Sequence, residues 1–385
     1  MRSIWILCLI LPVMNLTCAA EGEPKPIPRD GDPRLAEALA PIRERHKVPA
    51  IAAAIVTSKG LQSAASAGWR KAGTQIGVTA DDLWHLGSDT KAMTATLVGV
   101  LVERGLMRWD MTVGEVFSKH GAEFASATNI TVSMLLMHRA GLQPNLTWHK
   151  FKGSIREQRL AATREGLAKV TAATRSGYEY SNLGYVIVGA MIEQVTGSTW
   201  EQVMQRDLFR PLNMTNTGFG GMGTPGKIDQ PWGHTAKAKP VAANGESMDN
   251  PPVLGPAGRV HSTMGDWAKF IADQLRGARG QRALLKPETY KRIQTPVAGA
   301  EYALGWLVTQ RPWGLPPGLR GPESPQTATV LNHCGCNTMH YANVWLAPER
   351  DLALLVCVNQ GDDTAFEATD AAIAAMLKLC DAKPE

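Results

Sequence analysis

The 385-residue chain is low in charge and has no strongly basic segment. Lys, Arg, Asp and Glu make up 19% of it, the formal net charge is +5, and the basic residues are scattered. Proteins that bind nucleic acids gather Lys and Arg on one face or along one helix. We therefore expect no nucleic-acid partner.

The chain also lacks the short motifs of two large classes of hydrolase. None of its nine histidines forms an H-x-x-x-H or H-x-H pair, and Gly-x-Ser-x-Gly does not occur. Metal hydrolases use closely spaced histidines as ligands, and α/β-hydrolases carry their nucleophile in that glycine-flanked turn. We expect no metal, no cofactor and no α/β-hydrolase fold.

The one long apolar run at the N-terminus is typical of a targeting signal. A positively charged start precedes the apolar stretch Ile4 to Met14, and small residues follow up to Ala20. This layout predicts a secretory signal peptide at 1–20, followed by a leader at 21–32; a lipoprotein cut before Cys18 is the alternative. The run is too short to span a membrane and no later segment could do so. The mature protein is expected to be periplasmic or secreted, with no integral membrane segment.

Four cysteines would remain after that cleavage. Cys334 and Cys336 are expected on opposite faces of one strand, so that they do not bridge each other. Cys357 falls in an apolar strand and Cys380 in the last helix, where buried free thiols are the favoured interpretation. An even number of cysteines in an oxidising compartment permits disulfides, but this spacing is not that of a small disulfide-bonded fold.

Predicted strands stand at both ends of the chain. Ala50 to Thr57 and Leu61 to Trp69 form one predicted hairpin, and Tyr341 to Leu346 and Leu352 to Val358 form another. The part between them has mainly helical periodicity, and no repeat is visible. Strands at both ends around a helical middle indicate an antiparallel sheet built from the two terminal segments.

These patterns predict an α+β fold for residues 33–385. The sheet part, flanked by helices, is expected at about 33–86 and 291–385. A mainly helical part is expected as an insertion at about 87–290. The length and the 44% of hydrophobic residues are ample for one large core or two closely joined ones.

The stretch Trp84 to Ala95 holds the only Ser-x-x-Lys of the chain, Ser88 and Lys91. Residues three apart on a helix lie on one face, roughly 5–6 Å apart at Cβ. The residues from Lys91 to Leu101 are apolar on nearly every face, which predicts a buried helix. A buried lysine loses affinity for its proton and can act as the base that a serine nucleophile needs. The alternative is a capping serine and a solvated lysine on a surface helix.

A second motif, Tyr180-Ser181-Asn182, comes just before a long apolar helix. A tyrosine hydroxyl that faces a lysine would have its anionic form stabilised and could exchange a proton with Ser88. The Asn182 amide offers both a donor and an acceptor. The alternative is an aromatic side chain packed against a helix start that Ser181 or Asn182 caps.

A third motif, His333-Cys334-Gly335-Cys336, falls on a predicted strand late in the chain. A glycine there lets another backbone or a ligand approach closely. The Cys336 N–H could join that of Ser88 in an oxyanion hole. The alternative is a structural histidine near a sheet edge.

Ser-x-x-Lys, Tyr-x-Asn and His-x-Gly occur in that order and in the element types that the chemistry requires. With the phrases Leu135 to Leu142 and Tyr302 to Trp306, they identify a resemblance that covers about residues 33 to 380. The sequence resembles the serine beta-lactamase-related family, which includes class C beta-lactamases, D,D-peptidases, D-aminopeptidases and esterases. The resemblance implies a beta-lactamase/transpeptidase-like fold.

The resemblance also implies a role for each motif, with Ser88 as the acylated nucleophile. The residues that it implies are catalytic Ser88, Lys91 and Tyr180, and substrate-binding Asn182, His333, Gly335 and Cys336. It implies an exported serine hydrolase that acts through an acyl-enzyme on an amide or ester, with a D,D-peptide, an ester or a beta-lactam as substrate. A catalytically weak penicillin-binding or sensor-like relative is the alternative. We expect a small-molecule or peptide substrate and a monomer.

The chain departs from the family pattern at three places, one of which is Asn337-Thr338-Met339 where a small-Gly pair is usual, which predicts a narrower sheet edge. Class C beta-lactamases have Lys-Thr-Gly where this chain has His333-Cys334-Gly335, and a histidine is mostly neutral near pH 7. This departure disfavours efficient beta-lactam hydrolysis and favours peptidases and esterases. Arg259 stands where a small residue is common. It is either a carboxylate binder at the site or a surface arginine.

Overall fold

The computed structural model describes residues 29–382, apart from 122–123, 125–126, 128, 169, 171–176, 242–248 and 321–325. The predicted signal peptide and the lipoprotein alternative therefore lie outside the described residues. Among the described residues, no helix combines the length and the apolar character needed to cross a membrane.

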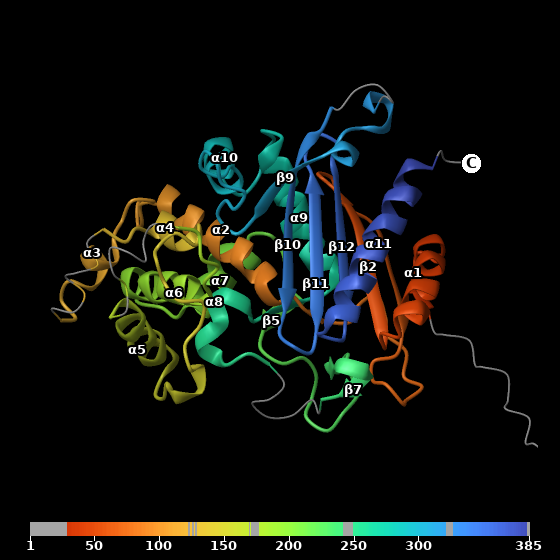
Figure 1. Ribbon diagram of the computed structural model, residues 1–385, viewed down its shortest axis with the longest axis horizontal. Coiled ribbons are helices and arrows are strands. Elements are labelled where there is room, and N and C mark those ends of the chain that lie inside the picture. Colours follow the sequence, from red (N-terminus) through yellow and green to blue (C-terminus); the bar gives the residue numbers. More distant parts are fainter. Residues whose placement is uncertain are drawn as a thin grey trace, which may run out of the picture.

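A seven-stranded antiparallel sheet is built from the two ends of the chain, as the sequence predicts (Figure 1). β2 comes from the N-terminal part and pairs with β12 from the C-terminal part, with Ala53 opposite Val356. In spatial order the strands are β1 (Arg29–Gly31), β3 (Gly60–Gly68), β2 (Ala50–Thr57), β12 (Leu352–Val358), β11 (Tyr341–Ala347), β10 (Ala328–Cys336) and β9 (Leu307–Arg311).

Helices cover both faces of this sheet because successive strand residues point to opposite sides. Ile51 and Ala53 of β2 share a core with α1 (Pro33–His46) and α11 (Asp363–Asp381). Ala52 and Ala54 belong to the larger core, which includes α9 (Met264–Ala278). The expected α+β, beta-lactamase/transpeptidase-like fold is confirmed.

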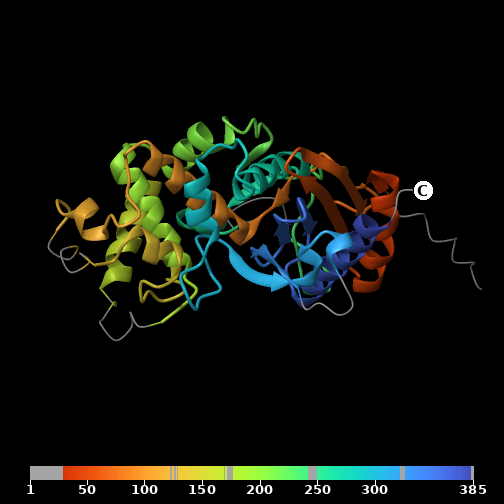
Figure 2. The same ribbon diagram turned by 90° about the horizontal axis from the view of Figure 1, so that it is seen from above.

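The other helices gather at one side of the sheet, at the left in Figures 1 and 2. α2 is the central one, and its residues from Thr90 to Leu101 are all buried, as the uniformly apolar run predicts. The remaining helices are α3 (Val113–Phe117), α4 (Val132–Leu136), α5 (Ile155–Leu167), α6 (Asn182–Thr196), α7 (Trp200–Met204), α8 (Gly255–Gly258) and α10 (Pro287–Gln294), with α2 at Thr90–Glu103.

Two small sheets and several short helices complete the described chain. One sheet joins β4 (Trp84–His85), β8 (Val260–Ser262) and β5 (Thr217–Phe219), and the other joins β6 (His234–Thr235) and β7 (Lys239–Pro240). The short helices are η1 (Gly87–Asp89), η3 (Trp148–Lys150), the π-helix η5 (Gln205–Phe209), η6 (Ala236–Ala238), η8 (Pro252–Leu254), η9 (Pro312–Gly314) and η10 (Pro317–Leu319).

The expected placement of the two strand cysteines is wrong. Cys334 and Cys336 are two residues apart in β10, and side chains at that spacing point to the same face. Tyr341, which stands opposite Cys336 on β11, also reaches Cys334. The thiols of Cys334, Cys336, Cys357 and Cys380 are all free.

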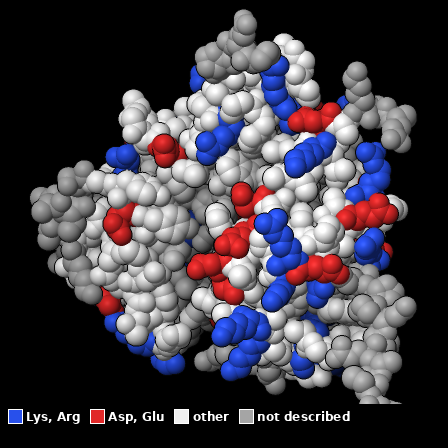
Figure 3. Space-filling model, turned by 45° about the vertical axis from the view of Figure 1, so that its right-hand side comes forward, with Lys and Arg blue, Asp and Glu red and all other residues white. Residues whose placement is uncertain are grey.

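Charges of both signs are interspersed on the face that Figure 3 shows. Lys and Arg alternate there with Asp and Glu over short distances. A nucleic-acid footprint would instead concentrate the basic side chains.

Candidate active site

Ser88 and Lys91 lie together at the start of α2. Ser88 belongs to η1, the single 3-10 turn that leads into the helix, and Lys91 lies in the first turn of α2. The Nζ atom of Lys91 is 2.9 Å from the Oγ atom of Ser88. The lysine is fully buried, whereas Ser88 is partly exposed and lines a cavity. The two side chains therefore face each other, as their spacing predicts.

The other contacts of Lys91 bear on its protonation state. Nζ also lies 2.7 Å from Oδ1 of Asn182 and 2.8 Å from the carbonyl oxygen of Ala257. Both oxygens only accept hydrogen bonds, so they take two N–H groups and leave the third position for Ser88. An ammonium that donates to all three oxygens and a neutral amine both fit this arrangement, and in the neutral form the lone pair can accept the serine O–H. Burial lowers the pKa of Lys91 well below its usual value, against the opposing effect of the Asp89 charge.

Tyr180 completes the group around the serine. The Nζ atom of Lys91 lies 4.8 Å from the centre of the Tyr180 ring, and the tyrosine has a side-chain hydrogen bond with Ser88. Burial raises the pKa of Tyr180 above its usual value, although the hydrogen bond with Ser88 acts in the other direction. The expected stabilisation of a tyrosinate is therefore wrong for the free site, where the phenol keeps its proton.

Asn182 is fixed at the start of α6. Ser181 caps this helix by accepting a hydrogen bond from the N–H of Gly184, so the capping interpretation of Ser181 also holds. The Oδ1 atom of Asn182 accepts from Lys91, and its Nδ2 atom donates to Oδ1 of Asn145 over 2.9 Å. The sequence offered no signal for Asn145, which lies in an irregular segment.

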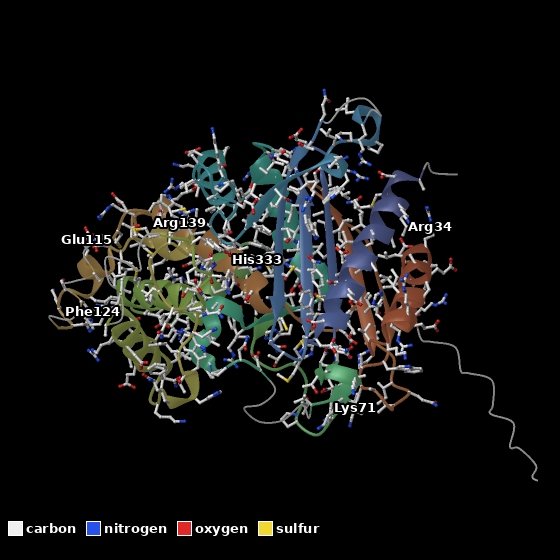
Figure 4. The ribbon with its side chains drawn as sticks, in the orientation of Figure 1. Arg34, Lys71, Glu115, Phe124, Arg139 and His333 are labelled. Atoms are coloured by element: carbon white, nitrogen blue, oxygen red, sulfur yellow. The ribbon has the colours of Figure 1, made fainter. Side chains whose placement is uncertain are left out.

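His333 lies deeper than the sequence predicts. It stands on β10, between the sheet and the helical side of the molecule (Figure 4), and it is buried. Nδ1 donates to the carbonyl oxygen of Cys334 over 2.9 Å, so Nε2 accepts from the hydroxyl of Tyr302 over 3.0 Å. Burial is the main cause that lowers the pKa of His333 to about 3, and a positive charge on Lys91 would act in the same direction. The imidazole is neutral and bound internally, and it is not among the described residues that line the cavity.

Gly335 and Cys336 bring the end of β10 against the serine turn. A Cβ atom on Gly335 would lie 1.9 Å from the carbonyl oxygen of Leu86 and 2.7 Å from the backbone nitrogen of Ser88, so only glycine fits there. The N–H of Asn337 donates toward β11, to the carbonyl oxygen of His340. Consecutive N–H groups of a strand point to opposite edges. The N–H of Cys336 therefore points away from β11, toward the serine turn.

The cavity in front of Ser88 has a volume of about 310 Å³. Three of the residues that line the cavity were predicted as site residues from the sequence, namely Ser88, Asn182 and Cys336. The other lining residues were not. They are Asn145, Leu146, Trp148, His149, Asn250, Pro251, Leu254, Ala257 and Gly258. The described lining thus combines carboxamides and the imidazole of His149 with apolar side chains, and contains no Lys or Arg.

Arg259 takes neither of the two places expected for it. Its Nε atom lies 3.0 Å from Oδ2 of Asp249, and it is only 17% exposed. Oδ1 of the same carboxylate lies 2.6 Å from Nε2 of the buried His85. The arginine is therefore part of a polar network behind the cavity. The Asp249 network has no signal in the sequence, since its members are far apart in the chain.

No metal site accompanies these groups in the part of the chain that the structure describes. Among those residues, no three His, Cys, Asp or Glu side chains are placed to hold an ion.

Comparisons with known proteins agree with the fold and with the family resemblance. The profile of the family "Beta-lactamase" matches residues 35–377. Penicillin-binding protein 4 from Amycolatopsis lactamdurans is 32% identical over 176 residues, 45% of each chain. The D-alanyl-D-alanine-carboxypeptidase/endopeptidase AmpH from Escherichia coli K12 is 27% identical over 322 residues, 78% of this chain and 77% of that protein. Unguisins hydrolase ungD' from Aspergillus campestris is 26% identical over 253 residues, 60% of this chain and 46% of that one.

The match thus spans about half the length of two of these relatives. Among solved structures, a class C beta-lactamase from Rhodobacter sphaeroides superposes with a TM-score of 0.68 at 19% identity, covering 89% of this chain and 99% of that one. The structure of SurE superposes with a TM-score of 0.70 at 22% identity, covering 91% of this chain and 77% of that one. At such identities the likeness concerns the fold. The family profile covers most of the chain, and the chain therefore belongs to the beta-lactamase family of serine hydrolases.

Proposed function

We propose that the protein is an exported serine hydrolase that cleaves an ester or an amide through an acyl-enzyme on Ser88. The contacts of Lys91 carry the proposal. Two acceptor-only oxygens, from Asn182 and Ala257, take two of its N–H groups, and the remaining position faces the Ser88 hydroxyl. This is the arrangement that a neutral amine needs in order to accept the serine proton. Export rests on the N-terminal sequence.

The reaction follows from this geometry. Lys91 takes the proton of Ser88 as Oγ bonds to the substrate carbonyl carbon, and negative charge develops on the carbonyl oxygen. The backbone N–H groups of Ser88 and Cys336 are the donors for that oxyanion. Tyr180, which holds its proton because its pKa is raised, protonates the leaving alcohol or amine and regains a proton from Lys91. Water then attacks the acyl-enzyme with the help of the same groups.

The cavity lining favours a substrate without a free carboxylate beside the scissile bond. His149 is the one basic side chain among the described lining residues, Arg259 is held by Asp249, and His333 is bound to Tyr302. The carboxamides of Asn145 and Asn250 suit peptide or acyl carbonyl groups instead. We therefore propose a neutral ester or an internal peptide bond as the substrate class.

The test is intact-mass spectrometry together with turnover of p-nitrophenyl butyrate, with Ser88→Ala as the control variant. Ester turnover that disappears in Ser88→Ala, at unchanged melting temperature, is the expected result. A penicillin adduct that persists without ester turnover would instead support the weak penicillin-binding relative. An adduct that forms and clears quickly would indicate a beta-lactamase and would contradict the proposed substrate class. If the protein shows no penicillin adduct and no ester turnover, the hydrolase proposal is overturned.

A further inference from the structure

We propose that Asp249 is a positioning residue that fixes the two backbone segments whose N–H groups form the oxyanion hole. The inference rests on the proposed function, since it concerns the same Ser88 site. Asp249 does not line the cavity and lies behind it, with only 9% of its surface exposed. Its carboxylate is bound by groups that come from three separate parts of the site.

The first part is the turn that carries the serine. Nε2 of His85 lies 2.6 Å from Oδ1 of Asp249, and Nδ1 of His85 accepts a hydrogen bond of 3.0 Å from the N–H of Gly87. Because Nδ1 is an acceptor, the ring proton is on Nε2, close to the carboxylate but outside hydrogen-bond geometry. The negative charge of Asp249 thus favours the His85 tautomer that holds the Gly87 N–H, one residue before Ser88.

The second part is the end of β10. Nδ2 of Asn337, the residue after Cys336, lies 3.3 Å from Oδ1 of Asp249. The Oδ1 atom of Asn337 accepts from the N–H groups of Met339 and His340 over 3.2 and 2.8 Å. One carboxamide therefore closes the turn after β10 and ties that turn to Asp249.

The third part is the cavity wall itself. Arg259, which follows the lining residues Ala257 and Gly258, binds Oδ2 of Asp249 over 3.0 Å. The Nδ2 atom of Asn250, which also lines the cavity, donates to the carbonyl oxygen of Gly258 over 2.8 Å. Asp249 and Asn250 thus join this wall to the serine turn and to the end of β10, the two segments that carry the oxyanion donors.

The contact between those two segments needs such support from behind. Gly87 has a φ of +49°, and a Cβ atom on it would lie 2.5 Å from the nitrogen of Cys336. No side chain fits between the two backbones, so none can set their separation. Their separation is then determined by what holds each segment from behind, and His85 and Asn337 both end on Asp249.

The Asp249 carboxylate is stable as an anion in this place. Burial alone would raise its pKa, but the close contact with His85, the charge of Arg259 and the N–H of Asn250 outweigh burial and bring the pKa to about 2. A buried carboxylate that is fully paired in this way is costly to disturb, as a fixed anchor requires.

The test compares Asp249→Ala and Asp249→Asn with Asp273→Ala as a matched control. Asp273 is also buried and also binds an arginine, a backbone N–H and a further side chain, namely Arg276, Leu284 and Tyr290. These contacts lie on α9, on α10 and in the segment between them, and none of them lines the cavity. For each variant the melting temperature, kcat and KM for the ester, and the affinity for phenylboronic acid are measured. Boronic acids form a tetrahedral adduct on a serine, so their binding reports on the oxyanion hole.

Asp249→Ala is expected to lower kcat by about 100-fold, near the effect of losing one oxyanion donor, with KM within about twofold. Phenylboronic acid affinity should fall in parallel with kcat. Asp249→Asn keeps an acceptor for His85 and should lose less. Asp273→Ala should lower the melting temperature but leave kcat and boronate affinity within about threefold. A folded Asp249→Asn or Asp249→Ala protein with wild-type kcat, or a kcat loss without a loss of boronate affinity, would overturn the inference.

Hydrogen exchange separates failure of this inference from failure of the proposed function. Asp249→Ala is expected to increase amide exchange in the peptides that cover residues 84–90 and 334–340, while peptides from β2 and β12 stay protected. This readout does not depend on turnover. Unchanged exchange in both peptides would overturn the positioning role even if the wild-type enzyme is active. If Asp249→Ala increases exchange in these peptides but the wild-type protein has no activity, the proposed function is overturned and the positioning role is not.

Discussion

The Nζ atom of Lys91 lies 2.8 Å from the carbonyl oxygen of Ala257, which is 166 residues further along the chain. This contact joins the helix that carries the serine to the wall of the cavity. Together with Asn182 it holds the amine within hydrogen-bond distance of Ser88.

Lys91→Arg is expected to abolish ester turnover, with a loss of about 1,000-fold or more in kcat. Arginine keeps its proton at any pH that the protein survives, so it cannot act as the base. Its larger head group also has no room between Asn182 and Ala257. Steady-state ester hydrolysis measures the loss, and circular dichroism checks folding. A Lys91→Arg enzyme within tenfold of the wild type would show that the base lies elsewhere.

The pH profile of kcat/KM should show the lowered pKa of Lys91 and no limb from the titration of His333. Burial lowers the pKa of Lys91, so the active neutral amine appears as the pH rises through a value well below 10.5. His333, with a pKa of about 3, adds no limb near pH 6.5. Because the pKa of Tyr180 is raised, it keeps its proton up to at least pH 10 and causes no alkaline decline. A rise centred near pH 10.5 would contradict this account.

Gly335→Ala should damage both activity and stability. The new Cβ atom would meet the carbonyl oxygen of Leu86 at 1.9 Å and the nitrogen of Ser88 at 2.7 Å, so the strand and the serine turn must separate. Overpacking of this kind costs about 1–3 kcal/mol or more, and kcat should fall by at least tenfold. Urea unfolding and ester kinetics measure the two effects. Gly318→Ala is the control, because nothing lies within 4 Å of its Cβ position; equal behaviour of both variants would refute the argument.

Stability should fall steeply as the pH drops below 6.5. Burial is the main cause that lowers the pKa values of four histidines, to about 2 for His138, 3 for His333 and His340, and 4 for His234. The unfolded chain binds protons at these sites from about pH 6.5 downward and the folded chain does not, so each site removes about 1.4 kcal/mol per pH unit.

The expected result is a free energy of unfolding that is several kcal/mol lower at pH 5 than at pH 7.5, measured by urea denaturation. His333→Gln removes one of these groups. The slope of the free energy of unfolding against pH should then decrease by the contribution of one bound proton, about 1.4 kcal/mol per pH unit. A stability that is flat between pH 7.5 and pH 5 would show that these imidazoles take up protons without unfolding.

The sequence by itself determined the features that depend on local order. The period of apolar residues and the turn residues led to the sheet from both ends of the chain and to the buried helix α2. The spacing of Ser88 and Lys91 set their shared face, because helix geometry alone controls it. Gly335 was a sign of close backbone approach, since a strand glycine leaves room that no other residue leaves. These inferences need no knowledge of distant partners.

Only the tertiary structure decided which distant groups meet these residues. A backbone carbonyl such as that of Ala257 has no sequence signal, and neither the contact of Asn145 with Asn182 nor the tie of Arg259 to Asp249 follows from spacing. The orientation of His333 toward Tyr302 was also decided there. Side-chain identity states what a group can donate or accept, whereas burial and the packing of remote segments decide which partner it finds and whether it keeps its proton.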